Sequence, residues 1–180
     1  PEKAIKLEKD ALAQIENITA DNARLVSNLH ANLGGLYRMN GHPDLAREHM
    51  EKSISLLDQF NLLHINDSIP QIANYAMFLT EQQEPERGIS ELQKLSGIIK
   101  EYHSDDCLDY AKVQETLGTI YLMTANLPQA KTHFKRAFKI YEKIWADEPE
   151  MIEAKYQEIQ ELYPQIGYKK RKNLSGLLTK

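Results

Sequence analysis

The chain has 180 residues, of which 42% are hydrophobic, and its formal net charge is -4. This length can bury a substantial core, either as one compact domain or as a short array of repeats. The negative charge argues against nucleic acid as the main partner, because phosphate binding needs a concentrated positive surface. The sequence also lacks an apolar run near the roughly 20 residues of a membrane-spanning helix, so we expect no membrane partner either.

The cysteine count predicts the cellular compartment of the chain, and its first residues predict whether it is part of a longer protein. Cys107 is the only cysteine, so an internal disulfide cannot form. A chain without disulfides fits a reducing compartment, which predicts a cytoplasmic protein. The sequence begins at Pro1, inside a predicted helix, without a signal-peptide pattern. We therefore expect a piece of a longer protein.

Apolar residues three or four positions apart predict a succession of helices and no strands. Gly41 ends the first clear helix, and Pro43 suits the first turn of the next, where its missing N–H is not needed. The same punctuation recurs at Pro85 and Pro128. The apolar stripe of the first of these helices consists of Leu25, Leu29, Leu33, Leu36 and Tyr37. The predicted helices cover residues 22–40, 44–62, 69–83, 86–103, 107–125, 128–146 and 150–163.

One helix-pair pattern occurs three times at a fixed step. A Leu-Gly-x-x-Tyr motif begins at Leu33 and again at Leu117, and a degenerate copy begins midway at Tyr75, so each step is 42 residues. Such a period indicates stacked helical units, which usually bind partners rather than convert substrates. Small residues on both helices of each pair would let the backbones approach closely. They are Gly34, Ala76 and Gly118 on the first helices and Ala46, Gly88 and Ala130 on the second.

Large residues recur at the same step and are predicted to fill the space between neighbouring pairs.

The motif resembles the tetratricopeptide repeat family, whose pattern is matched most fully in the third copy. The matching residues there are Leu117, Gly118, Tyr121, Ala130, Phe134 and Ala137. The resemblance implies an all-α fold, a tetratricopeptide repeat (TPR) α-solenoid of antiparallel helix pairs forming a right-handed superhelix. Because the usual period is about 34 residues, the longer repeats resemble those of kinesin light chains and of bacterial peptide-sensing regulators.

The repeat frame divides the chain into an array and a tail. The array covers residues 1–163, with a partial unit at 1–20, units at 22–62, 69–103 and 107–146, and a capping helix at 150–163. The first unit lacks its opening helix, so an apolar end would be exposed and a homodimer through that end stays open. Residues 164–180 are predicted to be a basic linker or tail that leads into a downstream domain.

The resemblance also implies a binding groove on the concave wall, which the family builds mainly from its first helices. Asn32 and Asn74 occupy the same slot one repeat apart. An amide can donate to and accept from a peptide backbone, so repeated asparagines can hold an extended peptide; an interhelical hydrogen bond without a ligand is the alternative. Methionines in the groove would form an adaptable apolar floor, and burial in the core is their alternative. The predicted groove residues are Asn28, Asn32, Arg38, Asn74, Met77, Lys112, Thr116 and Met123.

Catalytic chemistry is not indicated by any motif. The six histidines show no metal-ligand spacing, and Gly34-Gly35 lies inside a helical period without the strand or lysine of a phosphate loop. We therefore expect no cofactor, no metal and no enzymatic activity in this chain. The expected function is a protein- or peptide-binding module, the regulatory or scaffold part of a larger bacterial signalling protein.

Two alternative functions stay open. Residues Leu174-Ser175-Gly176-Leu177 resemble the opening of a GGDEF diguanylate cyclase domain, although Lys172 and Thr179 depart from that pattern. This resemblance implies the sensor domain of a cyclase whose catalytic domain is absent from the chain. The other alternative is a peptide-pheromone-sensing regulator.

Overall fold

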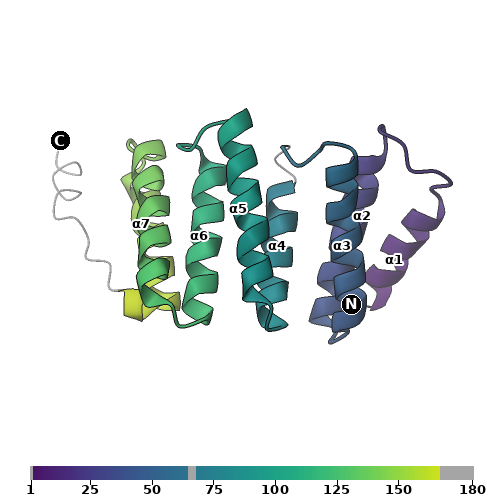
Figure 1. Cartoon of the computed structure of the whole chain (residues 1–180), viewed down its shortest axis with the longest axis horizontal. Helices are drawn as coiled ribbons and strands as arrows, with labels where there is room; N and C mark the ends of the chain where they lie inside the picture. The colour runs from purple at the N-terminus through teal and green to yellow at the C-terminus, as the bar shows by residue number, and fades with distance from the viewer. Residues whose placement is uncertain (1, 65–67, 167–180) are drawn as a thin grey trace. The chain divides into compact units, whose positions relative to one another are not determined.

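The computed structural model describes residues 2–64 and 68–166, and the chain divides into two compact units that we describe separately. All elements of the described residues are helices, which confirms the all-α prediction (Figure 1). Unit 1 (Pro1–Ser104) contains α1 (Glu2–Ala13), α2 (Ala23–Met39), α3 (Pro43–Gln59), α4 (Ser68–Glu81) and α5 (Pro85–Tyr102). Unit 2 (Asp105–Lys180) contains α6 (Leu108–Met123), α7 (Leu127–Ile144), α8 (Pro149–Leu162) and the 3-10 turn η1 (Pro164–Ile166). The extent of the array, 1–163, stays a prediction.

The turns between paired helices repeat the same backbone geometry. Gly41, Gln83 and Ala125, each 42 residues from the next, have φ angles of 75°, 64° and 58°. In each turn the following amide donates to a carbonyl five residues earlier, as His42 does to Tyr37 over 2.9 Å. This Schellman arrangement satisfies the last carbonyls of the helix but needs a left-handed residue. Only the first turn has the glycine that adopts this conformation without steric cost.

Close approach of the paired helices depends on the small residues that the sequence singled out. A Cβ at Gly88 would lie 2.6 Å from the carbonyl oxygen of Ala76, and one at Gly34 would lie 2.5 Å from the Cγ of Met50. At Gly118 a Cβ would lie 2.8 Å from the ring of Phe134. The predicted role of these residues in the pairs α2/α3, α4/α5 and α6/α7 is therefore confirmed.

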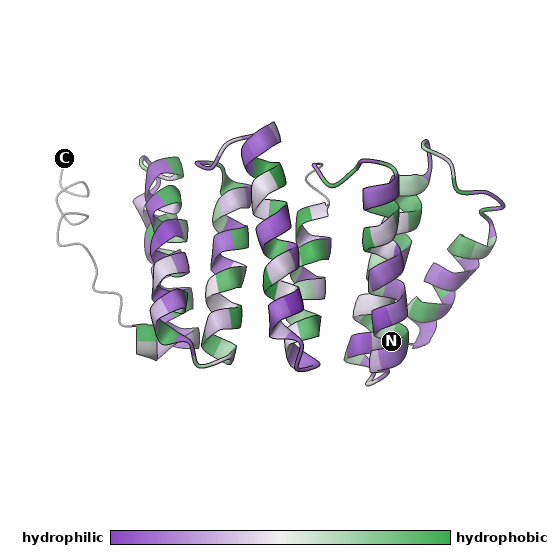
Figure 2. Ribbon diagram, viewed as in Figure 1, coloured by the Kyte–Doolittle hydropathy of each residue, from purple (hydrophilic) through white to green (hydrophobic). Residues whose placement is uncertain are grey.

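The core of unit 1 joins two helix pairs. Its buried cluster receives side chains from α2, α3 and α4, and Ile5 and Leu12 of α1 pack against it. Figure 2 shows that each of these helices carries both hydrophobic and hydrophilic residues, as expected of amphipathic helices. The cluster consists of Leu33, Tyr37, Ala46, Met50, Tyr75, Phe78 and Leu79.

The predicted stripe of α2 is wrong at its first residue. Leu25 is 54% exposed, whereas Ala23 and Val26 are buried. The buried face of α2 is centred on Val26 and Tyr37, because α2 packs against α1, α3 and α4, and Leu25 falls outside that face.

In unit 2, α8 covers α7 and reaches α6 through polar contacts. The rings of Phe138 and Tyr156 stack with centroids 4.3 Å apart. The Glu115 carboxylate of α6 accepts from the Tyr141 hydroxyl over 2.6 Å and from the Lys155 ammonium over 3.0 Å. Burial and the neighbouring Glu115 charge raise the pKa of Tyr141, so its hydroxyl stays a donor. These contacts fix α8 against the pair α6/α7.

We predict opposite effects for two glycines of α5. Gly88→Ala should destabilise the protein by about 2 kcal/mol, because the new methyl group meets a backbone oxygen that cannot move aside. Gly97→Ala should stabilise it by about 1 kcal/mol, because no atom lies within 4 Å of the added carbon and alanine favours the helix. Urea unfolding followed by circular dichroism measures both changes. Equal effects at the two positions would contradict the packing argument.

The turn geometry gives a second prediction. Ala125→Gly should stabilise the protein by about 1 kcal/mol, because it removes the steric cost of a left-handed alanine. Gly41→Ala should destabilise it by about the same amount, and it isolates the backbone effect because its added carbon meets nothing within 4 Å. Thermal unfolding of the two variants checks the sign of each change. A loss of stability in Ala125→Gly would refute the assignment of this turn.

Candidate functional site

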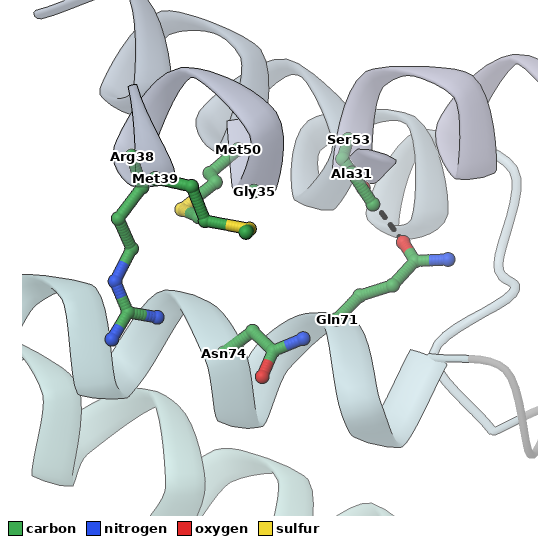
Figure 3. A pocket seen from close by; sticks show the side chains of 8 residues that line it. All are labelled: Ala31, Gly35, Arg38, Met39, Met50, Ser53, Gln71 and Asn74. Carbon is green, nitrogen blue, oxygen red and sulfur yellow. Dashed lines mark hydrogen bonds between the residues drawn. The ribbon is translucent and has the colours of Figure 1, made fainter. Parts of the chain in front are cut away.

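A surface groove lies between α2 and α4 of unit 1, above residues of α3. Its deeper part is a cavity of about 240 Å³, and a neighbouring hollow of about 430 Å³ shares Ala31, Gln71 and Asn74 with it. Figure 3 shows Asn74 and Gln71 on one helix and Arg38 and Met39 on another, with the opening between them. We call the two hollows together the α2–α4 groove. Its lining residues are Asn28, Ala31, Asn32, Gly35, Arg38, Met39, Met50, Ser53, Pro70, Gln71 and Asn74.

Gly35 keeps the deeper part of the groove open. A Cβ at this position would meet no atom within 4 Å beyond the neighbouring backbone of its own helix, in contrast to the tight packing at the adjacent Gly34. A glycine inside a helix costs roughly 0.5–1 kcal/mol relative to alanine. Close packing therefore explains Gly34 but not Gly35, whose missing side chain leaves room for a ligand atom.

A buried polar network supports the wall of the groove. The hydroxyls of Ser27 and Ser53, only 0% and 1% exposed, lie 2.8 and 2.6 Å from Oε1 of Gln71. The amide nitrogen of Gln71 donates to Oδ1 of Asn28. These four side chains link α2, α3 and α4, and the two hydroxyl donors hold the Gln71 amide in one orientation.

The sequence interpretation missed Gln71, although the repeat frame contained a signal for it. Ile69 and Leu95 stand 42 residues after Ser27 and Ser53, so two polar residues replace apolar ones at core positions. Buried hydroxyls require hydrogen-bond partners. The frame could therefore have predicted a polar residue near them, but not that Gln71 on α4 supplies it.

The asparagines of the predicted ladder line the groove but differ in their contacts. Asn32 donates from its amide nitrogen to Oε1 of Glu8 on α1 over 3.0 Å. Asn28 accepts from Gln71. Within the described ranges, no hydrogen bond engages the Asn74 side chain, which is exposed. Asn74 is therefore the member of the ladder most available to a ligand.

Two further predicted residues of unit 1 behave differently from each other. Arg38 lines the groove, but its guanidinium donates to both carboxylate oxygens of Glu81 on α4, one of them over 2.8 Å. This ion pair neutralises Arg38, which is the one cationic side chain among the described residues of the lining. Met77 is half-buried on α4 and is not among the lining residues, whereas Met39 lines the groove with 82% of its surface exposed.

The other three predicted residues lie on α6 of unit 2, whereas the α2–α4 groove is lined by unit 1 alone. The ammonium of Lys112 lies 3.8 Å from the carboxylate of Asp109, one helical turn away. Thr116 donates its hydroxyl to the carbonyl of Lys112 over 3.0 Å. Met123 is 48% exposed. The structure thus brings together four of the five predicted residues of unit 1, Asn28, Asn32, Arg38 and Asn74, and neither Met77 nor the three residues of unit 2 belong to the groove lining.

A metal centre and a membrane-spanning helix are both absent from the described residues. No group of three or more His, Cys, Asp or Glu side chains in residues 2–64 and 68–166 could hold a metal ion. None of the described helices combines the length and the apolar character needed to span a bilayer. The segment Leu174 to Leu177, which carries the cyclase resemblance, lies outside the described residues.

Comparisons with known proteins agree with the repeat fold. Residues 68–143, from α4 into α7, match the tetratricopeptide repeat family model. The crystal structure of BtubC (BKLC) from P. vanneervenii is similar with a TM-score of 0.69 and 18% identity, over 94% of this chain and 76% of that one. No curated protein matches the chain. At this identity the structural similarity concerns the fold alone. Residues 68–143 thus match the tetratricopeptide repeat pattern, and the described part of the chain has the helical repeat fold that the sequence predicted.

Proposed function

We propose that the chain is a non-catalytic interaction module that holds an extended peptide segment of a partner protein in the α2–α4 groove. Proteins of the tetratricopeptide repeat family bind protein partners. The observation that carries the proposal is the open cavity at Gly35, with apolar residues and amides around it. Pockets of this kind combine apolar area for affinity with a few polar groups that fix orientation.

The lining chemistry suits a peptide better than a charged small molecule. Ala31, Met39 and Met50 offer apolar surface to a ligand side chain. Asn74 offers both a donor and an acceptor to the ligand backbone, and Asn32 offers the oxygen that Glu8 does not use. Because Arg38 is already paired with Glu81, the groove does not select a carboxylate or phosphate through a lone cation.

We infer that the module is the regulatory or scaffold part of a larger cytoplasmic signalling protein, which is the role expected from the sequence. Lys112, Thr116 and Met123 would form a second contact area on unit 2. The exposed side chains of Leu7 and Ile18, with Leu25, support self-association through the α1 end. The cyclase and pheromone-receptor alternatives gain no support from the described residues, so we do not propose them.

Blocking the cavity should weaken peptide binding without loss of stability. Peptides are first selected from a displayed random library on the immobilised wild-type chain. Gly35→Leu should weaken their binding at least tenfold, because the new side chain fills the cavity, whereas leucine also favours the helix. Gly97→Leu, at an equally open helical site outside the groove lining, should leave binding unchanged. Fluorescence anisotropy measures the affinities. Equal binding by the two variants would rule out the groove as the binding site.

The amides give a second test with the same peptides. Asn74→Ala should weaken binding roughly three- to tenfold, the value of one hydrogen bond of about 1 kcal/mol. Asn32→Ala combined with Asn74→Ala should abolish capture while the circular dichroism spectrum stays helical. Gln93→Ala, which removes an exposed amide from α5, serves as the control. If the double variant binds as well as Gln93→Ala, the asparagines do not hold the peptide.

A further inference from the structure

Two histidines of unit 1 share a hydrogen bond between α2 and α3. Nδ1 of His30 lies 2.8 Å from Nδ1 of His49, and the ring centroids are 5.0 Å apart. Such a bond needs a hydrogen on one Nδ1 and a lone pair on the other. If both rings are protonated, two N–H groups and two positive charges face each other. The contact therefore exists only while at least one imidazole is neutral.

The third repeat contains an equivalent contact in which a neutral amide takes the place of one ring. Gln114 and His133 stand 84 residues after His30 and His49, and Nδ1 of His133 lies 2.9 Å from Oε1 of Gln114. Both second-helix histidines stack on a tyrosine: His49 on Tyr37 at 5.4 Å between centroids, and His133 on Tyr121 at 5.3 Å. An amide oxygen does not titrate in this range, so a protonated His133 can still donate to Gln114, although burial and the Arg136 charge lower the pKa of His133 as well. In the first repeat, the His30 ring, which can be protonated, stands at the position of the Gln114 amide.

The groups around the pair do not compensate for two protonated rings. Burial lowers the pKa of His30 to about 4, with further lowering by His49 and Lys52, while Glu48 opposes the shift. Burial also lowers the pKa of His49, where Lys9 of α1 acts in the same direction and Glu48 against it. An open hollow beside the rings is lined by Glu48, Glu51, Lys52 and Ser55 of α3 together with the two histidines, so protons can reach them from solvent.

We propose that the His30–His49 pair makes the α2–α3 helix pair acid-labile. Mild acidification then separates these two helices and disrupts the α2–α4 groove that they help to form. The groove depends on this pair because Ala31 and Gly35 belong to α2, and Met50 and Ser53 to α3. The direction follows from linkage: the opened state, with ordinary histidine pKa values near 6.5, binds protons more readily than the closed one. The contribution of the histidine pair to stability is therefore fully present above pH 6.5 and is lost as the pH falls toward 4.

A reciprocal exchange between the repeats tests this proposal. Urea unfolding at pH 7.5 and pH 5.0 gives the factor by which acidification raises the unfolding equilibrium constant. His30→Gln copies the pair of unit 2 and should reduce this factor about tenfold, the effect of removing most of one linked proton. Gln114→His should increase it by a similar factor. The histidines outside these two pairs keep the same surroundings in all three proteins, so their contributions cancel in the comparison.

Two measurements locate the effect and need no substitution. Amide hydrogen exchange, corrected for intrinsic rates, should accelerate at pH 5 in α2 and α3 more than in α6 and α7. In a proton NMR titration of the wild-type chain, the ring signals of His30 should shift well below pH 6.5. An unchanged pH factor in His30→Gln, uniform acceleration of exchange, or titration of His30 near pH 6.5 would each overturn the proposal.

Discussion

The close approach of paired helices at small residues is the constraint on which the rest of this structure depends. At Gly88 the helix backbones come so near that a single added carbon would lie 2.6 Å from a carbonyl oxygen. This contact sets the distance between the two helices of the pair α4/α5. Helices this close leave the large residues Tyr37, Leu79 and Met50 to fill the space toward neighbouring helices. The spacing of the helices in the repeat therefore depends on its small residues as much as on the large residues that fill its core.

Adjacent glycines on α2 show how a packing requirement and an open site can share one helix. Gly34 faces α3, where Met50 and Ala46 leave no room for a side chain. Gly35 lies about 100° further around the helix, on the wall of the groove, and touches nothing there. The first glycine is explained by helix packing, and the second by the space that it leaves for a ligand. Adjacent residues of α2 thus serve helix packing and the candidate binding site.

The first repeat departs from the repeat frame at three positions, and all three lie on helices that line the groove. Ser27 and Ser53 replace apolar residues of the following repeat and orient Gln71 at the groove wall. His30 replaces the glutamine of the third repeat and makes an interhelical bond dependent on protonation. Buried polar groups cost stability unless each is bonded, and here the bonds form only in one arrangement of the helices.

The sequence by itself determined the helices, their turns and the equivalence of residues 42 positions apart, because apolar period, glycine and proline act over a few residues of chain. The resemblance to tetratricopeptide repeats implied a shared surface for Asn28, Asn32, Arg38, Asn74 and Met77, and the structure brings the first four of these residues together. Only the tertiary structure decided which of them are available, since Glu8 engages Asn32 and Glu81 engages Arg38 from other helices. Those partners lie 24 and 43 residues away in the chain. A hydrogen bond depends on side-chain positions across helices, and periodicity along one helix does not specify them.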